Sequence, residues 1–316
     1  MTARDVPRHG LLVVDKPSGP TSHDVVAQAR RLLGTRRIGH AGTLDPLASG
    51  VLVLLLGEAT KLSDVATRDD KAYRARVSFG RGTTSHDAQG ETTAERAIVP
   101  GWLHEAMLEG ALELERRRTR QVPPAVSAIQ VGGQRSYRLA RAGAAPVLEP
   151  RTVEVRALTR LGHGDDFAEL ELRVSKGYYV RALARDLGVS LGIPAHLASL
   201  RRVQSGDFGV AEACTWPPAA PPVVIPLREA LPRLLPTWPL TPLGVERARH
   251  GKPLTAADFR LPPGPTDDDG RELVAWTDAT GNPVALGRRD GDVYRVQRGF
   301  RADPDATTAA RGISLR

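Results

Sequence analysis

The chain has 316 residues, of which 41% are hydrophobic and 25% charged, which predicts a folded protein of about two domains and excludes a wholly disordered chain. Its longest apolar run (residues 51–56) is too short for a membrane helix. Its polar N-terminus lacks a signal core, and its single cysteine, Cys214, excludes a disulfide framework or a multi-cysteine zinc site. We therefore expect a cytoplasmic protein. The 44 basic and 36 acidic residues give a net charge of +8, which fits a polyanionic partner or a GC-rich genome, whose codons favour Arg, equally well.

The first two thirds of the chain alternate strand and helix patterns. Residues 11–14 form an apolar strand pattern that ends in the turn 15–20. Thr21 or Ser22 can then cap a helix that runs to about Leu33, with Gly34 as its stop. Apolar or alternating patterns predict further strands at 51–56, 73–79 and 167–174, and helices at 101–118 and 179–188.

The last third divides at a proline-rich segment. Residues 217–239 contain eight prolines, which predicts a linker holding at most one short helix. Beyond it, β-like pieces at 272–276, 283–286 and 293–296 are separated by Gly and Asp turns, a pattern typical of a small β-barrel. Residues after Phe300 predict a frayed end.

Two short segments concentrate the residue types that carry chemistry. Residues 39–50 (GHAGTLDPLASG) place Asp45 in a Gly-rich loop directly before an apolar strand, where a carboxylate can reach the edge of a cleft. An ordinary Asp-Pro turn is the alternative. Residues 175–181 (SKGYYVR) bring two aromatic rings that can stack on a base and two cations that can bind a carboxylate or phosphate, although the rings could equally pack in the core.

Basic residues cluster in the N-terminal two thirds of the chain. Residues 238–316 carry 12 basic and 11 acidic side chains, so +7 of the net charge lies before them. The basic segment 116–141 is either a clamp for a polyanion or a solvated loop. The sequence contains no P-loop, no G-x-S-x-G elbow and no spacing of histidines suited to a metal, which excludes the enzyme classes that depend on these motifs.

Ordered motifs along the chain resemble those of the TruB family of tRNA pseudouridine-55 synthases. They are residues 10–22 (first motif), 39–50 (catalytic motif), 71–73 (Lys-Ala-Tyr), 123–128, 175–188 and 200–208, with a weaker match over 241–300. The chain departs from the family at Gln130, where a lysine is usual, and in the loop 84–90, which matches only approximately.

This resemblance implies an α+β fold with a particular domain order. A pseudouridine-synthase catalytic domain (1–216) would have a mixed β-sheet, flanking helices and a thumb-like, RNA-gripping insertion (116–146). A Pro-rich linker (217–239), a small PUA-type β-barrel domain that binds RNA (240–300) and a flexible tail (301–316) would follow.

The resemblance also implies the reaction. Uridine at position 55 in the T-loop of tRNA would be flipped out and isomerised to pseudouridine, with no cofactor and no metal. Asp45 would be the essential carboxylate, acting either as a nucleophile at C1′ or as a base at the 2′ position. Arg181 would keep Asp45 ionised in a dry pocket. Tyr73 would stack on the base and assist removal of the C5 proton.

Further site residues follow from the same resemblance. His40 would fill the space that the flipped base vacates, Tyr179 and Leu200 would line the uracil pocket, and Lys16 would support it. The partner would be tRNA, held at its T-arm and acceptor stem, with no membrane and no obligatory protein partner, and we expect a monomer. The side chains expected to bind RNA are Arg116, Arg117, Arg118, Arg120, Arg135, Arg138, Arg141 and Lys176.

Three alternatives differ in class. A guide-dependent relative would need a multiprotein particle, and the long insertion argues against it because that element would grip the T-loop directly. A tRNA-folding chaperone, whose catalysis is secondary, is compatible with the motifs as an additional role. A glycosidase for free nucleosides would need neither the basic insertion nor a second domain.

Overall fold

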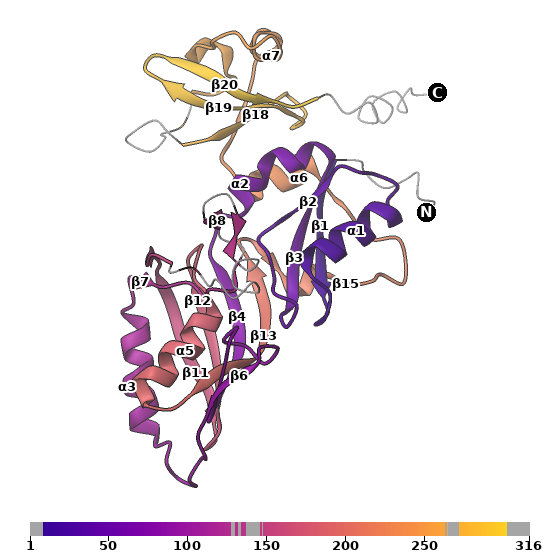
Figure 1. Cartoon of the computed structure of the whole chain (residues 1–316). Helices are drawn as coiled ribbons and strands as arrows, with labels where there is room; N and C mark the ends of the chain where they lie inside the picture. The colour runs from indigo at the N-terminus through magenta and orange to yellow at the C-terminus, as the bar shows by residue number, and fades with distance from the viewer. Residues whose placement is uncertain are drawn as a thin grey trace.

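The computed structural model of the chain describes residues 9–127, 130–131, 134–136, 146, 148–262, 264 and 272–301 (Figure 1). Its largest element is a ten-stranded mixed sheet, with the central order β11-β12-β4-β13-β3-β1-β15 and with β2, β14 and β16 paired beside this path. The strands are β1 (Gly10–Lys16), β2 (Ile38–Ala41), β3 (Ser49–Leu56), β4 (Lys71–Phe79), β11 (Val155–His163), β12 (Phe167–Val174), β13 (Ala195–Ser205), β14 (Phe208–Gly209), β15 (Cys214–Thr215) and β16 (Ile225–Pro226).

The pairing of β13 brings distant motifs together. β13 runs antiparallel to β4 and parallel to β3, and Arg202 is level with Tyr73 on one side and with Gly50 on the other. The end of β12 at Val174 is paired with Lys71 at the start of β4. The catalytic-motif loop, the Lys-Ala-Tyr segment and the loop after β12 therefore meet at the same end of these neighbouring strands.

Three helices pack on the sheet for reasons visible in their sequences. α1 (Ser22–Leu32) starts at Thr21, whose side chain and that of Asp24 form a capping box, and the next glycine, Gly34, has φ +60°. α5 (Val180–Leu191) ends at Gly192 in the left-handed conformation. α3 (Glu105–Arg116) packs against α5 and β11 (Figure 1).

The predicted N-terminal elements are present with shifted ends. The alternating segment 167–174 forms β12 at both predicted limits, and its buried residues follow the period of two. The helix predicted over 101–118 begins only at Glu105, because Gly101 has φ +75° and Trp102 turns back to donate to the Asp165 carbonyl. β11 and β13 have no counterpart in the prediction.

Short elements complete the N-terminal part of the chain. A 3₁₀ turn (Gly57–Leu62) leads into α2 (Ser63–Ala66), and three two-stranded ribbons lie beside the main sheet. These ribbons pair β5 (Arg81–Thr83) with β6 (Thr92–Glu95), β7 (Arg120–Gln121) with β10 (Arg151–Thr152), and β8 (Gln130–Val131) with β9 (Gln134–Arg135).

The proline-rich segment is more than the predicted linker. Its strand β16 pairs with the edge of β1, and α6 (Leu227–Ala230) continues into a 3₁₀ turn (Leu231–Arg233). Leu227, Ala230 and Leu231 are buried in the core beneath β1 and β3. Apolar residues between the prolines supply this burial, and the edge position of β16 tolerates Pro226.

The C-terminal residues form a separate four-stranded sheet (Figure 1, yellow). Its order is β17 (Thr237–Pro239), β18 (Val274–Thr277), β19 (Pro283–Asp290) and β20 (Val293–Gly299), with α7 (Pro242–Arg249) beside it. Trp238, Phe259, Trp276 and Tyr294 pack edge to face in its core. The expected closed barrel is not found among the described residues, where β17 and β20 remain the two edges of an open sheet.

A buried carboxylate ties this sheet to the N-terminal part of the chain. Glu58 is 1% exposed and accepts bonds from Arg37 (2.5 Å), Lys61 (2.5 Å) and the Arg301 backbone (2.9 Å). Phe300 is buried in the same apolar cluster as residues of β1 and β3. In the described part of the chain, no helix has the length and apolar character needed to cross a membrane.

Candidate active site

The loop between β2 and β3 presents Asp45 and is held in place by the first motif. Ser22 Oγ accepts from the Leu44 N–H at 2.8 Å and donates to the Leu44 carbonyl at 3.1 Å. The Gly19 N–H donates to the Pro46 carbonyl at 2.8 Å. The N-terminal end of α1 and the turn before it therefore fix the backbone on both sides of Asp45.

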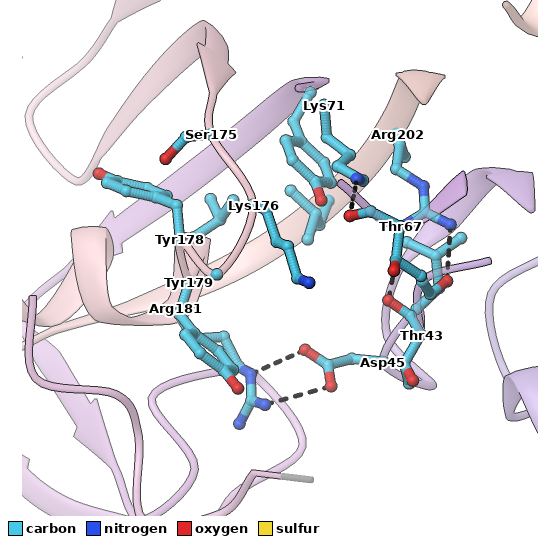
Figure 2. Close-up of a pocket in the computed structure, with 16 residues that line it drawn as sticks. Thr43, Asp45, Thr67, Lys71, Ser175, Lys176, Tyr178, Tyr179, Arg181 and Arg202 are labelled. Atoms are coloured by element: carbon cyan, nitrogen blue, oxygen red, sulfur yellow. Dashed lines mark hydrogen bonds and ion pairs between the residues drawn. The ribbon is translucent and has the colours of Figure 1, made fainter. Parts of the chain in front are cut away.

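Asp45 forms a bidentate ion pair with Arg181 (Figure 2). Arg181 Nε donates to Oδ2 at 2.8 Å and Nη2 donates to Oδ1 at 3.1 Å. The Arg181 side chain is 5% exposed and that of Asp45 is 35% exposed. A solvent-accessible carboxylate is thus anchored by a buried cation in the geometry that a guanidinium fork favours.

Arg181 needs several acceptors because its charged guanidinium is buried, and its place in the first turn of α5 adds the unfavourable helix dipole. Its Nη1 donates to the carbonyls of Ser85 (3.1 Å) and Val126 (2.9 Å). The buried Asp87 carboxylate lies 3.7 Å from Nε. The loop 84–90, only an approximate match to the family pattern, therefore still supplies two groups to Arg181.

A pocket of about 370 Å³ opens beside the ion pair. It brings together Asp45, Arg181, Tyr73, Tyr179 and Leu200, five of the residues that the sequence analysis assigned to the catalytic centre. This volume is at the lower end of the range for small-ligand sites. The other residues of its wall are Gly42, Thr43, Leu44, Thr67, Lys71, Ser175, Lys176, Gly177, Tyr178, Val180 and Arg202.

Tyr179 is anchored by a residue that the sequence analysis missed. Gln121 accepts from the Tyr179 N–H at 2.8 Å and donates to the Tyr179 carbonyl at 3.2 Å. Burial raises the pKa of the Tyr179 hydroxyl above its ordinary value, so Tyr179 keeps its proton at neutral pH. No motif marked Gln121, because its partner Tyr179 is 58 residues away in the sequence.

Two further cations line the pocket without having been assigned a role from sequence. Arg202 is buried and donates to backbone carbonyls of the Asp45 loop (Figure 2) and of β3. Lys71 donates to the carbonyls of Thr67 (2.8 Å) and Asp69, and burial lowers its pKa to about 8. Lys71 stands two residues before Tyr73, and Arg202 stands two residues after Leu200, in the motifs quoted above. This proximity was the signal that could have identified them.

His40 and Lys16 lie outside the pocket wall. The His40 ring, on β2, packs edge to face with His23 at a centroid distance of 5.3 Å. Lys16 is fully buried, and its Nζ donates to the carbonyls of Pro17 and Pro20, both at 2.8 Å. Lys16 therefore fixes the turn before α1, and this turn fixes the Asp45 loop.

The buried Lys16 predicts a rise of stability at alkaline pH. Burial lowers its pKa from 10.5 to about 8, against the attraction of Asp45. Between these values the unfolded chain keeps the proton and the folded chain loses it, so the free energy of unfolding rises with pH across this window. The contribution of Lys16 is up to about 3 kcal/mol, at 1.4 kcal/mol per pKa unit.

Urea unfolding at pH 7.5 and pH 10.5 tests this term. The wild type is expected to gain more stability at the higher pH than Lys16→Met, whereas the exposed-lysine control Lys252→Met is expected to gain as much as the wild type. An equal gain in the wild type and Lys16→Met would contradict the assignment.

The residues expected to bind RNA fall into three groups. Arg116 is the last residue of α3 and Arg117 and Arg118 follow it, and glutamates of this helix pair with them, including Glu113 at 2.8 Å from Arg117 and the buried Glu115 beside Arg118. Arg120 and Lys176 are exposed, and Lys176 lines the pocket. Arg138, Arg141 and the side chains of Gln130 and Arg135 lie outside the described residues.

The chain is similar to bacterial enzymes over most of its length. A family model described as "TruB family pseudouridylate synthase (N terminal domain)" matches residues 30–180. A "tRNA pseudouridine synthase B" of Mycobacterium sp. (strain KMS) is 45% identical over 260 residues, which are 78% of this chain and 85% of the relative. The protein of the same name from Leifsonia xyli is 42% identical over 303 residues, covering 93% and 97% of the two chains.

Solved structures share the fold at lower identity. A Cbf5–Nop10–Gar1 complex contains a chain with a TM-score of 0.71 and 24% identity, covering 95% of this chain and 88% of that one. An H/ACA RNP bound to a substrate RNA containing 2′-deoxyuridine contains a chain with a TM-score of 0.68 at the same identity, covering 93% and 86%.

Proposed function

Because the chain belongs to the TruB family and is a pseudouridine synthase, we propose that it converts uridine to pseudouridine at position 55 in the T-loop of tRNA. The relatives from Mycobacterium and Leifsonia carry the name tRNA pseudouridine synthase B, which supports tRNA as the substrate. The observation that carries the proposal is the bidentate pair of Asp45 and Arg181 at the mouth of a pocket walled by Tyr73, Tyr179 and Leu200.

The reaction breaks the N1–C1′ bond, turns the uracil and joins C5 to C1′. N1 gains a proton and C5 loses one, so neither water nor an electron is consumed. Asp45 would act as the nucleophile at C1′ or as the base at the 2′ position, and both routes need one free carboxylate oxygen. Arg181 donates only one bond to each oxygen, and a carboxylate oxygen can accept a second contact, so the flipped nucleotide can approach Asp45 while the pair persists.

The pocket walls suit a flipped uracil. Tyr73 stands at the start of β4 and would stack on the base. Leu200 supplies an apolar surface, and the protonated Tyr179 hydroxyl can bond a uracil oxygen. His40, next to the loop that carries Asp45, would fill the space left in the T-loop, and Lys16 would act only by supporting the loop.

RNA contacts outside the pocket would come from the insertion 116–146 and from the C-terminal sheet. Lys176 would bind RNA at the pocket mouth, and the T-arm would be bound by Arg120, Arg135, Arg138 and Arg141. Arg116, Arg117 and Arg118 would contribute once their ion pairs with the glutamates break. The C-terminal residues 240–300 would act as a PUA-type module on the acceptor stem, held at a fixed distance from the pocket by the Glu58 cluster. The enzyme would work in the cytoplasm as a monomer, without a cofactor or an obligatory protein partner.

A T-arm hairpin labelled with tritium at uracil C5 of position 55 tests the proposal. The wild-type protein alone is expected to release one tritium per hairpin, and a hairpin with cytidine at position 55 and label elsewhere is expected to release none. Tight binding without release would reject a stand-alone synthase and favour a guided enzyme or a chaperone. Rescue of tRNA folding by Asp45→Asn would add the chaperone role without removing the enzymatic one.

The Tyr73 hydroxyl gives a prediction for the last proton transfer. Tyr73→Phe keeps the ring that stacks on uracil and removes the hydroxyl that assists loss of the C5 proton. Tritium release is expected to slow by about 10²-fold, the lower range for general-base catalysis, with unchanged hairpin affinity. Tyr294→Phe, in the C-terminal sheet, is the control, and equal rates for the two variants would show that the Tyr73 hydroxyl takes no part.

A further inference from the structure

Arg202 joins the two ends of the loop that carries Asp45. Its Nη2 donates to the Gly42 carbonyl at 3.1 Å and its Nη1 lies 3.5 Å from the Thr43 carbonyl, on the side of the pocket drawn in Figure 2. Its Nε donates to the Val51 carbonyl at 2.7 Å. The first two carbonyls precede Asp45 and the third follows it. We propose that Arg202 is a positioning residue for the isomerisation, which sets the place of the Asp45 carboxylate through this backbone; the inference rests on the proposed role of Asp45.

The charge of Arg202 is buried without a carboxylate partner. The side chain is 1% exposed, and no ion pair to it is found in the part of the chain that the structure describes. Its neighbour Arg201 shows the contrast, because it pairs with Asp15 at 2.6 Å on a half-exposed surface. A cation buried in this way is a poor source of stability, which points to a role in geometry.

The glycines of the catalytic motif are complementary to Arg202. Gly50 lies level with Arg202 in the parallel β3–β13 pair and has φ +102°, and a Cβ there would lie 2.1 Å from the Arg202 carbonyl. Gly42 has φ +85°, a conformation that other residues rarely adopt. These glycines let both ends of the loop approach β13 closely enough for one guanidinium to reach them.

The reaction makes this positioning necessary. A nucleophile or base must stand about 3–3.5 Å from the atom it attacks, and a displacement of 1 Å can cost about 10²-fold in rate. Arg181 holds the Asp45 carboxylate from the α5 side. Arg202 and Ser22 hold the backbone of the loop, one from the sheet and the other from α1.

Arg202→Met and Arg202→Lys test the inference, with Arg201→Met as the control on the same strand. Tritium release from the T-arm hairpin is measured in single turnover at saturating enzyme, and hairpin affinity is measured separately. Arg202→Met is expected to be about 10²-fold slower with unchanged affinity. Arg202→Lys is expected to stay slow, since lysine keeps the charge but not the planar fork. Arg201→Met is expected to match the wild type.

Several outcomes would overturn the inference. A wild-type rate for Arg202→Met would show that the loop needs no such contact, and a wild-type rate for Arg202→Lys would assign the role to charge alone. Loss of affinity in proportion to rate would make Arg202 an RNA contact. If Arg202→Met melts below the assay temperature, Arg202→Lys decides by the same criterion. A wild type that releases no tritium would overturn the proposed function and this inference together, whereas an active Arg202→Met beside an active wild type overturns this inference alone.

Discussion

Asp45→Asn is expected to release no measurable tritium from the T-arm hairpin while binding the hairpin as tightly as the wild type. The loss of rate should exceed about 10⁴-fold, the upper range for a general base, because asparagine can neither attack C1′ nor accept the 2′ proton. The substitution preserves volume, and Arg181 keeps its carbonyl partners Ser85 and Val126. The folded structure and the RNA surface should therefore be unchanged.

The matched control for Asp45→Asn is Asp64→Asn, an exposed aspartate in α2. It is expected to keep the wild-type rate and affinity. A rate for Asp45→Asn within tenfold of the control would assign the essential carboxylate to another residue. A loss of affinity equal to the loss of rate would instead make Asp45 a binding group.

The residues of the pocket could be predicted from the sequence better than the residues that hold the pocket in place. Asp45, Tyr73, Tyr179, Arg181 and Leu200 stand in short motifs, and the pocket contains all five. Tyr73 lies near the start of β4, and Tyr179 and Arg181 lie at the start of α5, so short local patterns mark them. Gln121 and Arg202 bind backbone groups far away in the sequence, so only the folded structure reveals their contacts.

The missed strands have a physical reason. β13 reads Ala-His-Leu-Ala-Ser-Leu-Arg-Arg-Val-Gln-Ser, a polar segment with two register shifts, yet it lies between β4 and β3 in the centre of the sheet. It buries the side chains of His196 and Arg202, which hydrogen bonds to the backbone make tolerable. A search for apolar alternation does not find such a strand.

The basic segment shows the limit of counting charges. Arg116, Arg117 and Arg118 read as one end of a polyanion clamp, but Glu109, Glu113 and Glu115 precede them on the same helix. Pairs three or four residues apart face each other on a helix. The glutamates are plain in the sequence. Pairing them with the three arginines would have predicted a clamp that begins nearer Arg120.

Arg181→Met is expected to damage both stability and rate. It leaves Asp87, 7% exposed, without its neighbouring cation, and removes the donor to the Ser85 and Val126 carbonyls. Loss of one partner of a buried ion pair typically costs about 3–5 kcal/mol. The rate should fall at least about 10²-fold, because Asp45 loses the cation that orients it.

Arg185→Met is the control, one turn further along α5, where Arg185 pairs with Asp186 at 2.7 Å on a more exposed surface. It is expected to cost less than about 1 kcal/mol in urea unfolding and to keep the rate. If Arg181→Met proves as stable as Arg185→Met, the role of Arg181 as the buried counter-ion is contradicted.

Adding Asp87→Asn to Arg181→Met separates the two effects. The second substitution removes the uncompensated buried carboxylate, and its amide oxygen can still accept the bonds that Ser85 Oγ (2.6 Å) and the Gln89 N–H (3.1 Å) now donate to Asp87. Stability should recover by a large part of the loss, whereas the rate should not, because Asp45 still lacks its cation. Recovery of both would mean that Arg181 serves the fold alone, and recovery of neither would place the instability in the unpaired carbonyls of Ser85 and Val126.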